Sequence, residues 1–306
     1  MEDLSKALGL ITNAGNIRFD EPMSGHTTFR CGGPADIFVT PNNIEEAAAI
    51  VRLLLARKDT FFILGNGSNL LVSDKGYRGT IVNIAKGCDF INVDGNLITA
   101  GAGALLSQVA MAAYRNSLEG LEFASGIPGT VGGAITMNAG AYGGEMKNVV
   151  KKVRLLDFGT GNIVEKSCAE MDFSYRYSIV KSQPCMILEV DYELQSGDAL
   201  KIKSVMDELN EQRRSKQPLE YPSAGSTFKR PEGFFAGKLI QDAGLKGYSV
   251  NDACVSEKHS GFVVNKGHAT ATDIMELIRY VRKTVLDKFG VELVPEVILL
   301  GEGMEL

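Results

Sequence analysis

Two glycine-rich segments constrain what this chain can fold into and bind more than any other feature. Residues 64–71 read LGNGSNLL and residues 125–134 read SGIPGTVGGA, and strand-like runs flank both. Glycine lets a backbone approach a ligand closely, and successive amide groups in such turns can point at one anion. Two segments of this kind predict a nucleotide cofactor with a pyrophosphate, whereas the alternative interpretation is two ordinary turns.

Neither segment matches the two commonest nucleotide-binding motifs. A P-loop ends in Gly-Lys-Ser/Thr, and both segments lack that lysine. The fingerprint GxGxxG fails because Leu70 stands where the third glycine belongs after residues 65–67, and Leu106 after residues 101–103. No long parallel β-α-β pattern follows either site, so a doubly wound dinucleotide fold is not indicated.

Length and charge restrict the class of protein further. At 306 residues the chain is longer than a typical single domain, which predicts two or three domains. A net charge of −5 argues against a nucleic-acid binder. The first residues lack a basic region followed by an apolar one, and no apolar run approaches the roughly 20 residues of a bilayer span. We therefore expect a cytoplasmic protein with no membrane segment and no nucleic-acid partner.

The cysteines indicate neither a disulfide framework nor a metal site. The five cysteines are widely scattered, and no pair has the C-x-x-C spacing typical of zinc or redox sites. We therefore expect reduced thiols and no metal ligands.

Apolar periodicity predicts an α+β protein with three domains. Asn42 or Asn43 caps an expected helix with acidic residues at its start, and Gly290 ends the last helix. A charged helix near residues 200–214 marks a domain boundary. The predicted domains are residues 1–79, 80–198 and 199–306. The predicted helices cover 44–58, 105–118, 200–214 and 273–289, and the predicted strands 61–64, 80–85, 97–100, 149–158, 162–165, 185–194 and 291–300, with a loop-rich stretch over 220–247.

Two polar residues in the last third of the chain have unusual neighbours. Glu296 interrupts the apolar run LVPEVILL, so its carboxylate is paired, is kept protonated by burial, or faces water at a strand edge. Ser226 follows small residues and precedes Lys229 and Arg230, which suits a serine beside an anion. The G-x-S-x-G elbow of a serine hydrolase is absent, and the alternative is a loop with only a structural role.

Arg176 and His259 are the remaining candidates. Arg176 lies between Tyr175 and Tyr177, where its guanidinium suits bidentate binding of a carboxylate. The alternative interpretation is a surface arginine stacked on tyrosine. His259 has the sequence surroundings of a hydrogen-bonded loop histidine.

In their order along the chain, these motifs resemble one family of flavoenzymes, the UDP-N-acetylenolpyruvoylglucosamine reductases of peptidoglycan synthesis. The resemblance spans roughly residues 27–300, and the combination is far more specific than any single motif. The matching motifs are residues 28–35 (TFRCGGPA), 65–71 (GNGSNLL), 126–133 (GIPGTVGG), 138–143 (NAGAYG), 175–176 (YR), 224–229 (AGSTFK) and 295–297 (PEV).

The resemblance implies an α+β fold. It would consist of a two-lobed FAD-binding domain of the vanillyl-alcohol oxidase (PCMH) type and a C-terminal α+β substrate-binding domain. In the longer class of this family, an insertion with a substrate tyrosine follows the Tyr-Arg motif. Here Ser178 leads directly through Pro184 into an expected strand, so the chain is similar to the shorter class. The implied contacts to the substrate diphosphate are then Tyr175, Lys229 and Arg230.

The resemblance also implies the ligands. FAD is the implied cofactor, and NADPH and UDP-N-acetylglucosamine enolpyruvate are the implied small-molecule substrates of a monomeric enzyme. The implied cofactor contacts are Gly65, Asn66, Gly67, Ser68, Asn69, Leu70, Ser125, Gly126, Pro128, Gly129, Thr130, Gly132, Gly133, Asn138, Gly140 and His259.

The implied catalytic residues are Arg176, Ser226 and Glu296. After NADPH has reduced FAD, hydride passes from flavin N5 to the terminal CH₂ of the enolpyruvyl ether, and negative charge spreads into the carboxylate. Arg176 and Glu296, the latter as a neutral acid, would each stabilise that charge by about 3–4 kcal/mol. Ser226 would protonate the neighbouring carbon. The alternatives are a sugar or alcohol oxidase of the same fold, which needs a base, and a non-enzymatic flavin-binding regulator.

Overall fold

Helix α2 (Ile44–Arg57) shows how local sequence signals set the boundaries of an element. The computed structural model describes residues 2–305; Met1 and Leu306, the ends of the first and third predicted domains, lie outside them. The side chain of Asn43 accepts a hydrogen bond from the amide of Glu46 at 2.8 Å, which caps the first turn. The helix stops at Lys58, whose backbone is left-handed with φ at 60°. The helix predicted from the sequence is therefore confirmed.

The chain divides into two compact units, each assembled from separate stretches of sequence. The first unit comprises Met1–Arg18, Ile37–Asn66 and Thr80–Arg213. The second comprises Phe19–Asp36, Gly67–Gly79 and Arg214–Leu306. The division into three consecutive domains stays a prediction.

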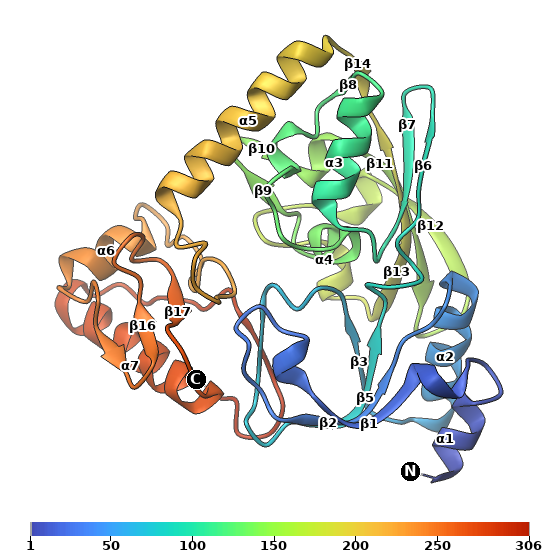
Figure 1. The fold of residues 1–306 in the computed structure, drawn as a ribbon, viewed down its shortest axis with the longest axis horizontal. Helices are drawn as coiled ribbons and strands as arrows, with labels where there is room; N and C mark the ends of the chain where they lie inside the picture. The colour runs from blue at the N-terminus through green and yellow to red at the C-terminus, as the bar shows by residue number, and fades with distance from the viewer. Residues whose placement is uncertain (1, 306) are drawn as a thin grey trace. The chain divides into compact units, whose positions relative to one another are not determined.

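The first unit contains a five-stranded antiparallel sheet. Its strand order is β12-β11-β13-β7-β6. Helices α3 (Leu106–Arg115) and α4 (Val131–Thr136) pack against β7 and its neighbours, and Figure 1 shows both helices beside the sheet. The strands are β6 (Ile91–Asp94), β7 (Leu97–Gly101), β11 (Val150–Asp157), β12 (Ile163–Ser167) and β13 (Cys185–Glu193). The four strands expected near 97–100, 149–158, 162–165 and 185–194 are confirmed.

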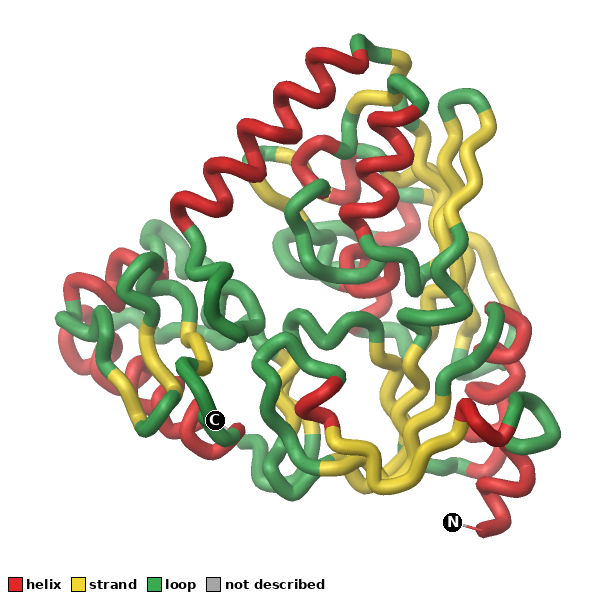
Figure 2. Tube along the Cα trace, viewed as in Figure 1, coloured by secondary structure: helices red, strands yellow, loops and turns green. Residues whose placement is uncertain are grey.

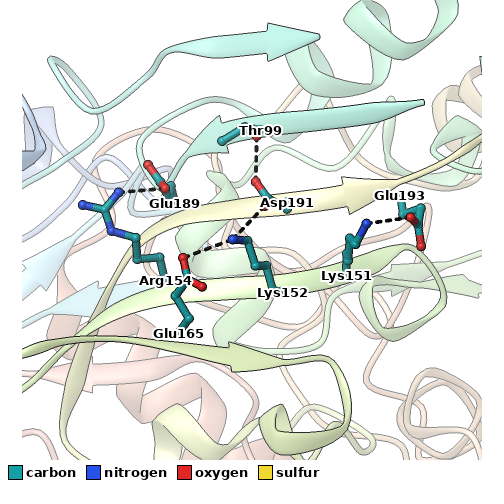
Figure 3. Close-up of polar contacts among 8 residues, drawn as sticks. All are labelled: Thr99, Lys151, Lys152, Arg154, Glu165, Glu189, Asp191 and Glu193. Carbon is teal, nitrogen blue, oxygen red and sulfur yellow. Dashed lines mark hydrogen bonds and ion pairs between the residues drawn. The ribbon is translucent and has the colours of Figure 1, made fainter. Parts of the chain in front are cut away.

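The polar face of this sheet carries a row of cross-strand pairs, drawn in Figure 3. Asp191, which is 9% exposed, accepts a hydrogen bond from Thr99 at 2.7 Å and lies 3.6 Å from Lys152. Exposed ion pairs contribute little stability, at most about 1 kcal/mol each, but opposite charges across strands favour one register. The other pairs are Lys152–Glu165 at 3.1 Å, Arg154–Glu189 at 2.9 Å and Lys151–Glu193 at 2.8 Å.

A smaller parallel pair of strands leads into the first glycine segment. β3 (Phe61–Leu64) runs parallel to β5 (Tyr77–Asn83), with Phe61 opposite Thr80. Both strands belong to a four-stranded sheet of order β1-β2-β5-β3, in which β1 is Ile17–Pro22 and β2 is Pro34–Val39. The glycine segment therefore starts at the carboxyl end of a strand, as the sequence predicts.

Helix α7 (Ala271–Phe289) organises the core of the second unit. Thr270 and Asp273 form a capping box at its start, and Gly290 ends it with φ at 67°. The helix packs on the antiparallel strands β15 (Ser249–Val250), β16 (Ala253–Val255) and β17 (Val263–Asn265). Figure 1 shows it beside β16 and β17. The short helix α6 (Ala236–Asp242) lies in the stretch expected to be rich in loops and was not predicted.

The expected closing strand over residues 291–300 is mostly wrong. Only β18 (Ile298–Leu300) is a strand, and it pairs in parallel with β4 (Leu70–Val72). The segment before it faces another partner, because the amide of Lys229 donates to the carbonyl of Val294 at 2.8 Å. Pro295 has no amide hydrogen to continue a ladder. The segment therefore changes partners midway, and Glu296 lies just outside the strand.

The expected helix over 105–118 ends early, at Arg115, and a two-residue strand follows. Helix α5 (Ala199–Lys216) matches the expected charged helix. Figure 2 shows residues 217–235 after it as a long loop. No helix within residues 2–305 combines the length and apolarity needed to cross a bilayer. The remaining elements are α1 (Glu2–Leu8), β8 (Leu118–Glu119), β9 (Gly140–Ala141), β10 (Gly144–Glu145), β14 (Gln195–Ser196) and the 3-10 helices Ala14–Asn16, Met23–Gly25, Glu122–Ala124, Met146–Asn148, Ala169–Met171 and Ile179–Lys181.

Candidate active site

Within the first unit, Gly65 and Asn66 of the first glycine segment lie against the second glycine segment. The side-chain amide of Asn66 donates to the carbonyl oxygen of Pro128 at 2.6 Å. A Cβ atom on Gly65 would overlap the hydroxyl of Thr130, so glycine is needed for this approach. Segments far apart in the sequence thus meet through this hydrogen bond and the close approach of Gly65 to Thr130.

The backbone amides of the two segments differ in what they bind. In the second segment, the amides of Val131 and Gly132 donate to backbone carbonyls at 2.8 Å, and that of Gly133 to the Thr130 hydroxyl at 3.5 Å. The amides of residues 65–69 donate to no group within residues 2–305. Successive amides of this kind beside a glycine cradle fit the pyrophosphate of a nucleotide such as FAD. The amide of Gly132 bonds to Ala102, directly after β7, and that of Gly133 is capped by Thr130 at the start of α4.

Gly67 is required by the fold of the second unit. Its φ is 61°, and a Cβ atom there would overlap the carbonyl oxygen of His26. Its own carbonyl accepts a hydrogen bond from the amide of Thr28 at 3.2 Å. Leu70, three residues on, is 3% exposed and belongs to β4, so its side chain is part of the core.

Helix α5 contacts the start of the second glycine segment. Asn210 donates its side-chain amide to the hydroxyl of Ser125 at 3.1 Å. A Cβ atom on Gly126 would lie 2.7 Å from Oδ1 of Asn210 and 3.0 Å from Cδ of Arg213. The sequence interpretation did not include Asn210 or Arg213, although their spacing of three residues places both on one helix face.

Asn138 holds two loops of the first unit together. Its side-chain nitrogen donates to Glu145 at 2.6 Å and to the carbonyl of Ser174 at 3.2 Å, and its oxygen accepts from the amide of Lys147 at 3.0 Å. These bonds use both donors and one acceptor site of the amide. A Cβ atom on Gly140 would crowd the facing strand of the β9–β10 hairpin. Both residues therefore shape the loops around them.

Arg176 lies in a tight turn with a left-handed backbone. The amides of Ser174 and Tyr177 each donate to the other's carbonyl at 3.1 Å, and φ of Arg176 is 53°. The ammonium of Lys181 donates to the Arg176 carbonyl at 2.8 Å. The guanidinium lies 5.2 Å from the ring centre of Tyr175, which is 55% exposed. The stacking of arginine on tyrosine is therefore confirmed, and the φ value is a strained one for a residue other than glycine.

The backbone around Thr227 is fixed by hydrogen bonds, and the side chain of Ser226, one residue earlier, is exposed. Gly225, the residue before Ser226, has a φ of 74°. Thr227 is fully buried; its amide donates to the Gly261 carbonyl at 2.8 Å, and its hydroxyl accepts from the amide of Val263 at 2.9 Å. The role of Thr227 has no sequence signal beyond its place in the AGSTFK motif.

Both the amide and the carbonyl of Glu296 form hydrogen bonds. Its amide donates to the carbonyl of Thr227 at 2.8 Å, and its carbonyl accepts from the side-chain amide of Asn69 at 3.1 Å. The amide of Ile298 donates in turn to the Asn69 carbonyl at 2.9 Å. The second unit thereby brings together the Ser226 loop, Glu296 and the end of the first glycine segment.

His259 lies beside the same backbone. Its Nδ1 accepts a hydrogen bond from the amide of Gly261 at 3.1 Å, and its ring meets the edge of Phe262 at 5.0 Å. Burial lowers the pKa of His259. The ring is therefore neutral near pH 7, with its proton on Nε2, and the interpretation as a hydrogen-bonded loop histidine is confirmed.

The two cations after Ser226 lie near the surface. The guanidinium of Arg230 lies 4.0 Å from the ring centre of Phe235, which is 61% exposed. Lys229 is tied to Val294 through its backbone, so its side chain is not needed for that contact. All five cysteines are free thiols, and within residues 2–305 no cluster of three His, Cys, Asp or Glu could hold a metal ion.

Comparisons with known protein families match both halves of the chain. Residues 35–167 match a family described as FAD binding domain. Residues 217–300 match a family described as UDP-N-acetylenolpyruvoylglucosamine reductase, C-terminal domain.

Similar proteins cover almost the whole chain. The UDP-N-acetylenolpyruvoylglucosamine reductase of Caldanaerobacter subterraneus subsp. tengcongensis is 53% identical over 301 residues, which is 98% of this chain and 99% of that protein. The same enzyme of Clostridium perfringens is 52% identical over 296 residues, 97% of each chain.

Solved structures agree. The crystal structure of the Thermus caldophilus UDP-N-acetylenolpyruvylglucosamine reductase has a TM-score of 0.79 and 34% identity, covering 93% of this chain and 98% of that one. Alkyldihydroxyacetonephosphate synthase shares only the fold, with a TM-score of 0.50 and 13% identity over 64% of this chain and 40% of its own. The expected fold class, an FAD-binding domain followed by a C-terminal α+β domain, is confirmed.

Proposed function

The chain belongs to the UDP-N-acetylenolpyruvoylglucosamine reductase family, and on this basis we propose which of its residues carry out the reduction. It is an FAD-dependent oxidoreductase of peptidoglycan synthesis that reduces UDP-N-acetylglucosamine enolpyruvate with NADPH. Bound FAD supplies the hydride, taken from NADPH, that reaches the enolpyruvyl group. Full-length similarity at 53% identity is the observation that carries this assignment.

The first glycine segment is proposed to hold the FAD pyrophosphate. The amides of residues 65–69 have no acceptor within residues 2–305, and the Asn66–Pro128 bond fixes the loop that carries them. Ser125, Gly126, Gly129 and Thr130 would line the same cradle. His259 is proposed to donate Nε2–H to the cofactor, because Nδ1 already accepts from Gly261. Of the other cofactor residues inferred from the family motif, Asn138, Gly132, Gly133 and Gly140 would act by keeping the loops in shape.

Arg176 and Glu296 are proposed to stabilise the negative charge that builds up on the substrate carboxylate. A guanidinium binds a carboxylate with two parallel hydrogen bonds, and a neutral carboxylic acid can donate a third. Fixed donors of this kind are worth about 3–4 kcal/mol each in the transition state. The strained turn at Arg176 and the doubly hydrogen-bonded backbone of Glu296 support this, because both fix the backbone from which the side chain projects.

Ser226 is proposed to protonate the substrate carbon next to the site of hydride addition. Its side chain is exposed, while the buried Thr227 beside it fixes the backbone. A serine is a weak acid, but a carbanion is a strong enough base to take its proton. Tyr175, Lys229 and Arg230 are proposed to bind the substrate diphosphate.

We further propose a monomeric enzyme with three domains, over residues 1–79, 80–198 and 199–306. NADPH and nucleotide sugars are cytoplasmic metabolites, so the proposal places the reaction in the cytoplasm.

One assay tests the reaction against its alternatives. Under anaerobic conditions, NADPH consumption beyond one equivalent per bound flavin should occur only when the enolpyruvyl sugar nucleotide is added. An oxidase would instead need oxygen and a sugar or alcohol, and a flavin-binding regulator would show no turnover. The serine, arginine and glutamate suit the stabilisation and protonation of an anion, whereas an oxidase needs a base to remove a proton from a hydroxyl.

A further inference from the structure

Helix α5 carries a cation to the start of the second glycine segment. A Cβ atom on Gly126 would lie 3.0 Å from Cδ and 3.3 Å from Nη1 of Arg213, so the arginine side chain lies directly against this glycine. Asn210, one turn earlier on the helix, fixes the register through its 3.1 Å bond to the Ser125 hydroxyl. Because Gly126 has no side chain, the guanidinium can occupy the space above the loop.

Arg213 differs from the arginines that serve the fold. Arg154 and Arg282, for example, pair with carboxylates at 2.9 and 3.1 Å. Within residues 2–305 the half-buried guanidinium of Arg213 forms no ion pair and no hydrogen bond. Burial lowers the pKa of Arg213, and Tyr142 is the group that most opposes this. A cation withdrawn from water without a counter-ion is unfavourable, so its position calls for an anion from outside the chain.

We propose that Arg213 binds a phosphate group of one of the two diphosphate-containing ligands of this enzyme. The proposal rests on the proposed function, because FAD and the sugar nucleotide both contain a pyrophosphate. A guanidinium suits this task because its planar fork pairs with two phosphate oxygens at once. Tyr142, in the turn of the β9–β10 hairpin, is the residue that interacts electrostatically with Arg213.

A purely structural role does not account for this arrangement. Asn210 already ties α5 to Ser125, and the packing of Arg213 on Gly126 would be gained equally by an uncharged side chain of similar length. The positive charge therefore needs a reason of its own. Arg213 lies in the same unit as Asn66 and Pro128. Of the three diphosphate contacts inferred from the sequence, only the uncharged Tyr175 belongs to this unit, whereas Lys229 and Arg230 belong to the other.

The test compares Arg213→Gln with Arg214→Gln, which removes the same charge from the next, exposed position. FAD binding to the stripped protein is measured by flavin fluorescence, and sugar-nucleotide binding to the flavin-loaded protein by flavin absorbance. We expect Arg213→Gln to weaken one of the two at least 10-fold, since a charged hydrogen bond is worth about 1.5–3 kcal/mol. A loss of FAD affinity identifies the cofactor pyrophosphate, and a loss of sugar-nucleotide affinity alone identifies the substrate diphosphate. Arg213→Lys keeps the charge but not the planar guanidinium, so its affinity should lie between those of wild type and Arg213→Gln.

Thermal unfolding of the FAD-free protein separates binding from folding. Without ligand, Arg213→Gln should unfold at the wild-type temperature or above it, because an unpaired buried charge has been removed. Inorganic pyrophosphate should raise the unfolding temperature of wild type and Arg214→Gln but not of Arg213→Gln, a result that does not depend on the proposed substrate. The proposal is overturned if both affinities stay within twofold of wild type, or if Arg213→Gln and Arg213→Lys destabilise the ligand-free protein. Failure of wild type to bind the sugar nucleotide would instead contradict the proposed function.

Discussion

The carbonyl oxygen of Thr227 accepts a hydrogen bond from the amide of Glu296 at 2.8 Å. The bond links the residue after Ser226 to a segment 69 positions further along the chain. Asn69 holds the other side of the same glutamate through its carbonyl at 3.1 Å. Two of the three proposed catalytic residues therefore share one backbone framework with the first glycine segment.

Replacing Thr227 with valine should destabilise the protein by about 1–3 kcal/mol, the usual penalty for a buried donor left without an acceptor. The threonine hydroxyl accepts the amide of Val263 at 2.9 Å, and both residues are buried. Urea unfolding of the FAD-free protein measures the effect. Thr227→Ser keeps the hydroxyl, so its free energy of unfolding should fall much less. An equal fall in the two variants would show that the hydrogen bond is unimportant.

Asn66→Ala should weaken FAD binding by roughly 3- to 10-fold, because a hydrogen bond contributes about 0.5–1.5 kcal/mol. The side chain is exposed, and its hydrogen bond to Pro128 joins the two glycine segments. Fluorescence titration of the stripped protein with FAD measures the change. Asn116→Ala is the matched control, since that exposed asparagine also donates to a backbone carbonyl, of Ala112. Unchanged FAD affinity in Asn66→Ala would separate this contact from the cofactor.

Stability should fall in mild acid through His259. Burial lowers its pKa in the folded protein below the unfolded value of about 6.5, so the unfolded chain binds the extra proton more readily. The contribution of His259 to the free energy of unfolding is therefore complete above pH 6.5. It is lost as the pH falls through the lowered pKa of the folded protein.

His259→Asn keeps an acceptor for the Gly261 amide but does not titrate, so its unfolding midpoint should change less between pH 7.5 and 5.5 than that of wild type. The exposed His268 provides the control variant His268→Gln, which should follow wild type. The same pH slope in wild type and His259→Asn would rule out this linkage.

Local signals in the sequence predicted the elements that rest on local interactions. Helix α2 follows its Asn43 cap, and the strands of the large sheet follow their apolar alternation. Helix α6 was missed because it is only seven residues long, contains Gly237, and starts at Phe235, which makes no side-chain cap. Periodicity has little to act on in so short an element.

Contacts between distant residues set the rest. The expected closing strand failed because residues 294–298 exchange one backbone partner for another, and no local pattern encodes that exchange. The sequence motifs identified Ser226 and Glu296 but not the peptide bond to Thr227 that joins them. The motifs also did not reveal Arg213. Its significance is that no carboxylate within residues 2–305 pairs with it, and its neighbours along the sequence do not show this.

The two half-reactions of Ser226→Ala test the central claim most directly. NADPH should reduce the bound flavin at close to the wild-type rate, because Ser226 is proposed to act only on the second substrate. Oxidation of the reduced flavin by the enolpyruvyl sugar nucleotide should slow by about 10²–10⁴-fold, the usual effect of losing a general acid. Binding of the sugar nucleotide should change little, since one hydroxyl contributes roughly 1 kcal/mol.

Stopped-flow absorbance of the flavin measures both steps, with Ser223→Ala as a control serine in the same loop that should match wild type in each. A selective loss of the second half-reaction in Ser226→Ala is the result that the proposed mechanism predicts. Equal slowing of both half-reactions, or of neither, would contradict the assignment of Ser226 as the proton donor.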